Sequence, residues 1–272
     1  MSTPDVLTVR SLMFVPAGRP DMIAKIPRWK PDVVVVDLED AVAAGDKEAA
    51  RRTAVTSIQE LEHPAVFLRV NPAGSPWHAE DVAAAAGAGV AGVVLPKLEQ
   101  LADLELPRHR GLRVLGGLET VRGVADARLL LDEGELVAAY FGAEDFISDM
   151  GGHRTAANAE VLYARSAVCL AARLAGVPAI DQAVVAVRDD AAFRADAAEG
   201  RALGYVGKIA LHPAQVLLAH EAFTPSEQEV DRAKAVLAVG EGVGVVDGQM
   251  VDDVHRRMAE QVLARAVGGA AR

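Results

Sequence analysis

The stretch Val33-Val-Val-Val-Asp-Leu-Glu-Asp-Ala41 sets four consecutive valines directly before three acids. An apolar run without polar alternation is typical of a strand that is buried on both faces, as in a parallel sheet covered by helices. The acids follow at the carboxyl end of that strand, the end where barrel enzymes gather their functional side chains. This segment therefore predicts a parallel α/β fold with a polar site at the ends of its strands.

Similar short runs recur along the chain and alternate with longer helical stretches. The predicted strands are Ser11–Val15, Val33–Asp37, Val66–Val70, Gly92–Leu95, Arg113–Leu118, Val137–Gly142, Ala179–Asp181 and Gly207–Ala210. Their ends follow one another at a step of about 28 residues, which fits one strand plus one crossover helix. The even step favours a closed (β/α)8 TIM barrel over an open doubly wound sheet. The glycine-rich run at 86–92 precedes a strand, the wrong order for a phosphate-binding loop.

The composition changes after the eighth strand. We expect the barrel to occupy residues 1–212 and a C-terminal helical extension, a lid or arm, to occupy 213–272. Pro213 is expected to open a helix that ends near Phe223, and a second helix is expected to follow Thr224. The chain then passes a possible tight turn at Gly248 and ends in a helix to Ala266, with a frayed tail over 268–272.

Composition excludes several classes of protein. Of the 272 residues, 51% are hydrophobic and 24% are charged, which is the profile of a globular chain with a sizeable core. The net charge of −10 and the lack of a basic block argue against a nucleic-acid partner. The longest uncharged stretch, 82–96, is too short to cross a bilayer, so we expect no membrane partner. The first twenty residues lack a continuous apolar core, so we expect a cytoplasmic protein.

The lone cysteine, Cys169, lies in an apolar helical run. It permits no intrachain disulfide and no thiolate metal cluster, and we expect it to be a packed thiol.

Two acids stand at the ends of consecutive predicted strands. Glu119 closes the fifth strand, and Asp145 follows the sixth. Adjacent strands lie about 4.8 Å apart, so both side chains can reach one hard cation. Mg²⁺ suits such a pair because it takes one or two carboxylates and keeps its other positions for water or substrate oxygens. The alternative is that each acid caps the helix that follows it.

Further charged residues lie at the same predicted edge. Arg69 closes the third strand, where a guanidinium can bind a substrate carboxylate bidentately or form an ordinary salt bridge. Glu39 and Asp40 follow the second strand, where they either orient metal-bound water and Arg69 or cap the helix that begins near Asp46.

Three other polar residues near strand ends have simpler explanations. Lys97 and Lys208 could meet anionic substrate groups, but pairing with nearby acids explains each of them equally simply. His212, the one histidine at a strand end, is expected to cap a helix or to form a core hydrogen bond. No nucleophile elbow and no cysteine–histidine pairing stands at a strand end, so metal-assisted chemistry is the class that remains.

A series of short motifs runs in order from Arg10 to about Ala264. The motifs are Arg10-Ser-Leu-Met-Phe-Val-Pro16, Asp37-Leu-Glu-Asp-Ala-Val42, Lys47-Glu48 with Ala50-Arg51, Arg69-Val-Asn-Pro72, Leu95-Pro-Lys97, Leu118-Glu-Thr120, Phe141-Gly-Ala-Glu-Asp145, Tyr163-Ala-Arg-Ser166, Ala179-Ile-Asp181, Gly207-Lys208, His212-Pro213 and Asp247-Gly-Gln-Met-Val-Asp252. In order and number they resemble those of the citrate lyase beta subunit-like (CitE-like) proteins of the HpcH/HpaI aldolase/citrate lyase family. One departure is Ala17, where relatives usually carry glycine in a loop near coenzyme A.

The resemblance implies a metal-dependent (β/α)8 lyase or synthase that acts beside a coenzyme A thioester. By motif, Glu119 and Asp145 are similar to the family's Mg²⁺ ligands, and Arg69 with Glu119 to its substrate-binding residues. Asp252 is similar to a lid acid that a neighbouring subunit contributes. Taken locally, a structural Asp that caps the helix from Asp253 onward explains the residue equally well. The resemblance further implies a homotrimer or hexamer.

The implied reaction is a reversible Claisen-type cleavage. A short 3-hydroxyacyl-CoA, such as malyl-, citramalyl-, citryl- or hydroxymethylglutaryl-CoA, gives a keto acid and acetyl-CoA or propionyl-CoA. Asp252 is the first candidate for proton transfer at the thioester carbon and Glu39 the second, with Asp40 beside them. Three alternatives stay open: a citryl lyase beta subunit acting on an acyl-carrier-protein thioester, a class II pyruvate aldolase that does not use CoA, and a non-catalytic CoA-binding barrel.

Overall fold

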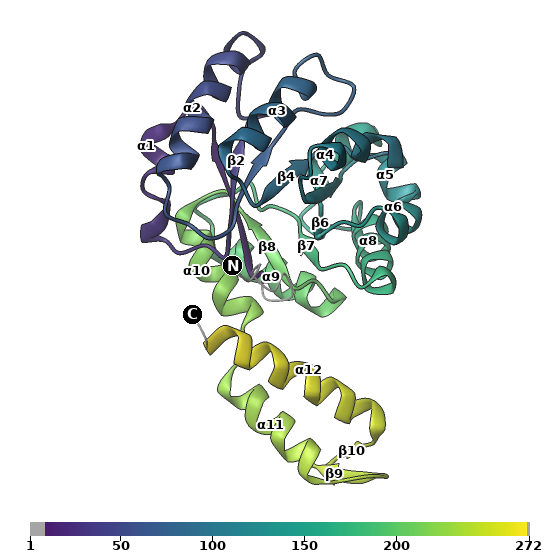
Figure 1. Cartoon of the computed structure of the whole chain (residues 1–272). Helices are drawn as coiled ribbons and strands as arrows, with labels where there is room; N and C mark the ends of the chain where they lie inside the picture. The colour runs from purple at the N-terminus through teal and green to yellow at the C-terminus, as the bar shows by residue number, and fades with distance from the viewer. Residues whose placement is uncertain (1–8, 271–272) are drawn as a thin grey trace. The chain divides into compact units, whose positions relative to one another are not determined.

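Eight parallel strands close into a barrel in chain order, with the first strand paired to the eighth (Figure 1). The computed structural model describes residues 9–270, and the side chains of residues 9–266. The strands are β1 Ser11–Pro16, β2 Val33–Asp37, β3 Val66–Arg69, β4 Gly92–Leu95, β5 Val114–Leu118, β6 Ala138–Phe141, β7 Ala179–Asp181 and β8 Gly207–Ala210. Each bound lies within one residue of the predicted one, and the predicted TIM barrel is confirmed.

The barrel interior is filled by side chains that alternate along the strands. Val33 and Val35 of β2 point inward, and so do Tyr140 of β6 and Ile209 of β8. The intervening residues face the surrounding helices, and both sets are buried, which explains why the strands read as continuous apolar runs.

The helices form the outer layer around this barrel (Figure 1). They are α1 Pro20–Ile23, α2 Lys47–Glu60, α3 His78–Ala88, α4 Glu105–His109, α5 Val121–Ala125, α6 Ala127–Glu133, α7 Ala143–Asp149, α8 Leu162–Ala175, α9 Asp190–Leu203 and α10 Pro213–Phe223. The alanine-rich stretch from Ala159 to Ala175 has the pattern of an outer helix, but helix α8 begins only at Leu162. Residues 159–161 form a turn instead, directly after Asn158 with its left-handed φ of 53°.

The chain divides into two compact units, one ending at Ala219 and the other beginning at His220. The second unit comprises α11 Glu227–Ala238, β9 Gly244–Val246, β10 Gln249–Val251 and α12 Asp253–Ala270. Asp247 and Gly248, with φ of 50° and 75°, join the two short strands, as a two-residue hairpin of the Asp-Gly kind requires.

The end of α12 differs from the expectation of a frayed tail over 268–272. The helix continues through Gly268 and Gly269 to Ala270, while residues 271 and 272 lie outside the described part of the chain. A glycine costs a helix about 1 kcal/mol, which weakens the helix without ending it.

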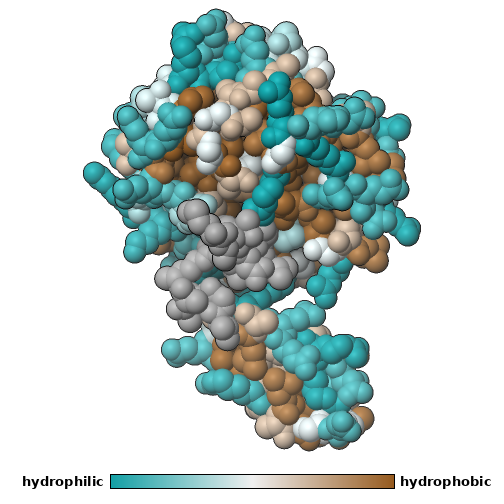
Figure 2. All heavy atoms as spheres, viewed as in Figure 1, coloured by the Kyte–Doolittle hydropathy of each residue, from teal (hydrophilic) through white to brown (hydrophobic). Residues whose placement is uncertain are grey.

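Hydrophobic side chains are also exposed on the outside of the barrel. An apolar groove runs along α5 to α8 and is lined by Val121, Met150, Tyr163, Leu170 and Leu174 among others. Figure 2 shows brown hydrophobic atoms between hydrophilic ones on the side of the barrel where these helices lie. Within the described residues, no helix is both long and apolar enough to cross a membrane.

Candidate active site

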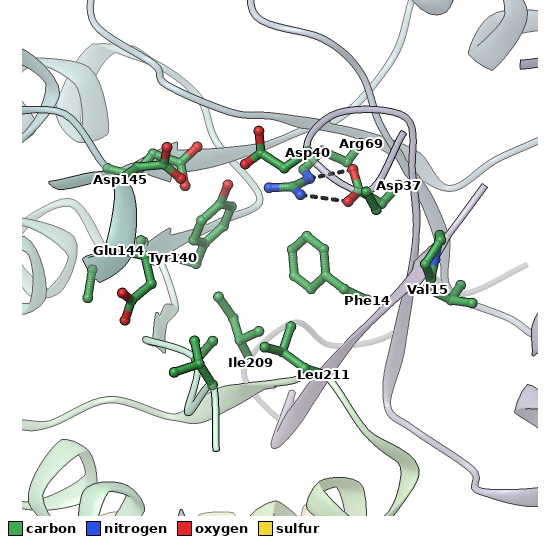
Figure 3. A pocket seen from close by; sticks show the side chains of 17 residues that line it. Phe14, Val15, Asp37, Asp40, Arg69, Tyr140, Glu144, Asp145, Ile209 and Leu211 are labelled. Carbon is green, nitrogen blue, oxygen red and sulfur yellow. Dashed lines mark hydrogen bonds and ion pairs between the residues drawn. The ribbon is translucent and has the colours of Figure 1, made fainter. Parts of the chain in front are cut away.

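A pocket of about 410 Å³ opens at the carboxyl ends of the strands (Figure 3). Its wall draws on several strands and the loops that follow them, with Phe14 from β1, Arg69 from β3, Tyr140 from β6 and Ile209 from β8. Glu119 and Asp145 line the same pocket. The barrel therefore brings together the arginine and the two acids that the sequence analysis placed at separate strand ends.

The Arg69 guanidinium is fixed by a bidentate ion pair with Asp37, drawn as two dashed lines in Figure 3. Its Nε and Nη2 atoms lie 2.6 Å from Asp37 Oδ1 and Oδ2, and Nη1 lies 2.8 Å from Glu39 Oε2. The guanidinium stacks over the Phe14 ring, 4.9 Å from its centroid. Asp37 occupies the edge formed by Nε and Nη2, so a bound carboxylate would have to use the edge formed by Nη1 and Nη2, where Glu39 already lies beside Nη1.

Glu39 and Asp40 differ in exposure although they are neighbours. Glu39 is buried against Arg69 and Lys97, and burial raises its pKa while the two cations lower it, with a net rise. The Asp40 side chain is 59% exposed and lies 3.8 Å from Lys97 Nζ. Asp46 precedes α2 without a side-chain capping bond, so the helix does not engage these acids as caps.

Lys47, in the first turn of α2, holds the backbone that carries these acids. Its buried Nζ donates to the carbonyl oxygens of Leu38 and Glu39 at 2.8 and 2.7 Å and to Asn71 Oδ1 at 2.7 Å. Three acceptors satisfy the ammonium, and they fix the direction in which the loop leaves β2. Lys47 was not among the site residues chosen from the sequence.

Glu119 is buried at the end of β5, and its Oε1 accepts a 2.8 Å hydrogen bond from the backbone amide of Lys97. Burial raises its pKa to about 7; Arg69 opposes that rise, and the Glu39 and Asp145 carboxylates add to it. Gly142, after β6, provides the space, because a Cβ there would lie 2.2 Å from Glu119 Oε2.

Asp145 lies in the first turn of α7, with a third of its side chain exposed, and its Oδ1 is 3.2 Å from Lys97 Nζ. Lys97 has a left-handed backbone, φ 49°, and its ammonium contacts Glu39, Asp40 and Asp145. The simpler expectation for this lysine, pairing with the acids, is therefore what the structure shows. A strained backbone at such a position is a common feature of functional sites.

The donor set fits a magnesium ion. Glu119 and Asp145 present carboxylates to one pocket, and burial raises the pKa of Glu119 more than Arg69 lowers it. In residues 9–266 no group of three or more histidine, cysteine or acidic side chains is arranged to hold a metal. Mg²⁺ does not require such a group, since it binds through one or two carboxylates plus water and substrate oxygens.

Lys208 and His212 do not belong to the pocket lining. Lys208 is fully buried between the sheet and α9, where it pairs with Asp181 at 2.8 Å and contacts Asp196. His212 Nδ1 accepts a 3.2 Å hydrogen bond from the backbone amide of Ala214 at the start of α10, as expected of a helix cap. Cys169 is buried, also as expected.

Tyr140 directly precedes the motif Phe141-Gly-Ala-Glu-Asp145 but is not among the site residues predicted from the sequence. Its side chain points into the barrel, is 1% exposed and meets the Phe14 ring edge-on at 6.1 Å between centroids. Two signals could have identified it: its inward position in the alternation of β6, and Gly117 on the neighbouring strand, which makes room for it.

Asp252 lies in the C-terminal unit, at the start of α12. Its Oδ1 accepts hydrogen bonds from the backbone amides of Val254 and His255 at 2.9 and 3.3 Å, and it lies 2.7 Å from His255 Nδ1. The hydrogen bond with His255 lowers the pKa of this carboxyl. The capping geometry considered from the sequence is thus present, and the role in proton transfer stays a prediction.

Comparisons with known proteins agree on one family. The model of the HpcH/HpaI aldolase/citrate lyase family matches residues 10–213. A citrate lyase subunit beta-like protein of Deinococcus radiodurans is 47% identical, over 97% of this chain and 99% of that protein. A (3S)-malyl-CoA thioesterase of Cereibacter sphaeroides is 32% identical over 94% of each chain.

Solved structures give the same result. The crystal structure of CitE from Mycobacterium tuberculosis in complex with magnesium, acetoacetate and coenzyme A has a TM-score of 0.86 at 33% identity, covering 94% of this chain and 97% of that one. The chain therefore belongs to the HpcH/HpaI aldolase/citrate lyase family, as its motifs predicted, and its enzyme class is that of a lyase.

Proposed function

We propose that this protein is a Mg²⁺-dependent carbon–carbon lyase that cleaves a short 3-hydroxyacyl-CoA into a keto acid and acetyl-CoA or propionyl-CoA. Malyl-, citramalyl-, citryl- and hydroxymethylglutaryl-CoA are the candidate substrates. The observation that carries the proposal is the meeting of Arg69, Glu119 and Asp145 in one pocket. The magnesium, acetoacetate and coenzyme A bound by the related CitE support it.

Each of these residues has a distinct part in the proposal. Glu119 and Asp145 hold Mg²⁺, which supplies stabilisation of the negative charge that develops on substrate oxygens. Arg69, anchored by Asp37, presents its remaining edge to the carboxylate of the keto acid. Substrate bound in this way has its reacting carbons between the guanidinium and the two carboxylates.

Cleavage also requires two proton movements. The substrate hydroxyl loses its proton, the bond between the carbinol carbon and the thioester α-carbon breaks, and the electron pair of that bond passes to the α-carbon, which then takes a proton. Asp252 is the proposed proton donor to that carbon, and it removes the same proton in the synthetic direction. Glu39 is the second candidate, because burial raises its pKa, and Asp40 lies beside it at the pocket.

A substrate screen tests the reaction. Purified protein with Mg²⁺ is given each of the four CoA thioesters, and release of acetyl-CoA and keto acid is followed. Equal release of both products from one thioester is the expected result. Release of free CoA without a keto acid would indicate thioester hydrolysis instead. Cleavage that requires an acyl-carrier-protein thioester, or that proceeds on a hydroxy-keto acid without CoA, would favour the other two enzymes considered from the sequence.

The metal site has its own test. Glu119→Ala removes a buried carboxylate from the proposed ligand pair, so calorimetry should detect no Mg²⁺ binding while circular dichroism shows an intact fold. Glu144→Ala is the matched control: Glu144 lines the same pocket but pairs with Arg154, so this variant should bind Mg²⁺ as the wild type does. Undiminished affinity in Glu119→Ala would remove Glu119 from the site.

We propose further that Asp252 acts in a neighbouring subunit of a homotrimer or hexamer. The exposed apolar groove along α5 to α8 supports an assembly of this kind. Asn caps a helix as well as Asp does, so a purely capping Asp252 predicts that Asp252→Asn is nearly silent. A proton-transfer Asp252 predicts a loss of turnover by about two to four orders of magnitude with Mg²⁺ binding unchanged.

Subunit mixing then tests the shared site. Asp252→Asn subunits and Arg69→Ala subunits are each expected to be inactive, and a mixed assembly contains sites in which both native residues are present. Activity should therefore return after the subunits exchange. An inactive mixture, after mass spectrometry has verified exchange, would contradict a site built from two subunits.

A further inference from the structure

The Tyr140 side chain occupies the floor of the pocket and is held there by the barrel itself. It extends inward from β6 and is 1% exposed, yet it lines the pocket (Figure 3). Gly117 is its register partner on β5, and a Cβ at Gly117 would lie 2.4 Å from the Tyr140 hydroxyl oxygen. The absence of a side chain at Gly117 on β5 thus leaves room for the hydroxyl of Tyr140.

The hydroxyl itself makes no hydrogen bond within the described part of the chain. Burial, and then the nearby Glu119 carboxylate, raise the pKa of the phenol well above its usual value, so it keeps its proton. Glu119 raises this pKa both by its charge and by a side-chain contact with the hydroxyl, so the two groups are close; by distance and angle together, that contact is not a formed hydrogen bond. A buried donor without an acceptor is costly, and such groups are rare unless a ligand supplies the partner.

Tyr205 shows how the same side chain is treated where no ligand is involved. It is also fully buried, but its hydroxyl donates a 2.7 Å hydrogen bond to the backbone oxygen of Arg165. The fold therefore satisfies the hydroxyl of one buried tyrosine internally and leaves that of the other without a hydrogen-bond partner beside the pocket.

We infer that Tyr140 is a specificity-determining residue whose hydroxyl donates a hydrogen bond to a 2-keto carboxylate bound in the pocket. The inference rests on the proposed function, since it uses Arg69 as the carboxylate site and Glu119 and Asp145 as the metal site. Arg69 and Glu119 line the same pocket as Tyr140, and both act electrostatically on its phenol, so the three groups lie close together. A ligand that contacts both the Arg69 guanidinium and a metal ion held by Glu119 and Asp145 would bring its oxygen atoms near the Tyr140 hydroxyl. A 2-keto acid suits this arrangement because it has acceptor oxygens on adjacent carbons.

The test compares Tyr140→Phe with the matched control Tyr205→Phe. Calorimetry of the Mg²⁺-loaded full-length protein with glyoxylate, pyruvate and oxaloacetate measures affinity, and thermal melting without ligand measures stability. Tyr140→Phe should weaken binding of at least one keto acid by about tenfold, the effect of one hydrogen bond, and leave Mg²⁺ affinity unchanged. Its melting temperature should stay constant or rise, because an unsatisfied hydroxyl is removed. Tyr205→Phe should melt lower and bind keto acids normally.

Each other outcome would overturn the assignment. Equal keto-acid affinity in Tyr140→Phe and wild type would show that the hydroxyl does not touch the ligand. A lower melting temperature together with weaker Mg²⁺ binding would show that the phenol supports Glu119 instead. If the wild type with Mg²⁺ binds none of the three keto acids, the proposed function fails, and the ligand class assigned to Tyr140 fails with it.

Discussion

The protein contains two groups of buried charges that look alike and differ in what surrounds them. The pocket cluster consists of Asp37, Glu39, Asp40, Arg69, Lys97, Glu119 and Asp145. The outer cluster, between the sheet and helices α8 and α9, consists of Arg165, Asp181, Asp196, Glu199 and Lys208. Five carboxylates face two cations in the pocket, whereas three face two in the outer cluster. The pocket cluster lines the pocket at the strand ends, whereas Asp196 and Glu199 of the outer cluster line a different pocket.

The difference appears in the pKa values of two buried acids. Burial raises the pKa of Asp196, but Lys208 and Arg165 together lower it by more than burial raises it. The net shift of this pKa is therefore downward. Burial raises the pKa of Glu119 to about 7, since Arg69 is outweighed once the Glu39 and Asp145 carboxylates are added. Close ion pairing therefore does not distinguish the two clusters. The larger surplus of carboxylates over cations in the pocket cluster does.

The largest expected effect lies in the outer cluster. Arg165 is fully buried and contacts Asp181, Asp196 and Glu199, so Arg165→Met leaves these carboxylates without their guanidinium. Removing one partner of a buried ion pair costs about 3–5 kcal/mol of folding free energy. Chemical denaturation measures that loss, and the folded fraction should still bind Mg²⁺ normally. Weakened Mg²⁺ binding in the folded protein would erase the distinction between the clusters.

A smaller effect, on ligand affinity, is expected in the pocket cluster. Arg69→Lys keeps the charge but loses the planar fork, so affinity for a keto acid should fall by about 1.5–3 kcal/mol. Calorimetry with pyruvate, oxaloacetate or glyoxylate measures the change. If lysine serves as well as arginine, the residue is structural, as Arg165 is.

The smallest effect concerns pH. In the proposed site Mg²⁺ would bind the ionised Glu119, whose pKa is about 7 without metal, so the affinity for Mg²⁺ should fall about tenfold for each pH unit below 7, or about 1.4 kcal/mol. Titrations in buffers of different ionisation enthalpy should show release of one proton at pH 6 and almost none at pH 8. Constant affinity from pH 6 to 8 would contradict the raised pKa.

The same group sets the sign of a stability change in the metal-free protein. The folded-state pKa of Glu119 lies above its ordinary value of 4.5, so its contribution to stability is complete below that pH and is lost as the pH rises through about 7. Glu119→Gln, which does not titrate, should remove this part of the pH dependence, and Mg²⁺ should offset the loss in the wild type.

The barrel and most of its site could be predicted because their signals lie within single segments. Valine runs such as Val33–Val36 give strand bounds directly, and Arg69, Glu119 and Asp145 stand at strand ends, where a parallel barrel brings side chains together. The start of α8 was less predictable, because residues 159–161 form a turn although their composition suits a helix.

The parts that were missed depend on which residues of separate segments face one another. Lys47 acts on the loop after β2 through backbone carbonyls, so no charge pattern in the sequence indicates its partners. Tyr140 reads as one more apolar core residue until its register with Gly117 is known. Register between strands is fixed by the closed barrel, and a single chain segment does not contain it.

Gly142 bears on how sequence variants of this protein should be interpreted. It carries no functional group, yet a methyl group there would fall 2.2 Å from Glu119 Oε2 and would have to displace the carboxylate. A mutational scan confined to charged residues would overlook Gly142. A score that treats glycine-to-alanine changes as mild would also rank Gly142→Ala among the harmless substitutions. When loss of function is diagnosed in this protein or its relatives, glycine positions that cannot accept a side chain should be examined together with the charged positions.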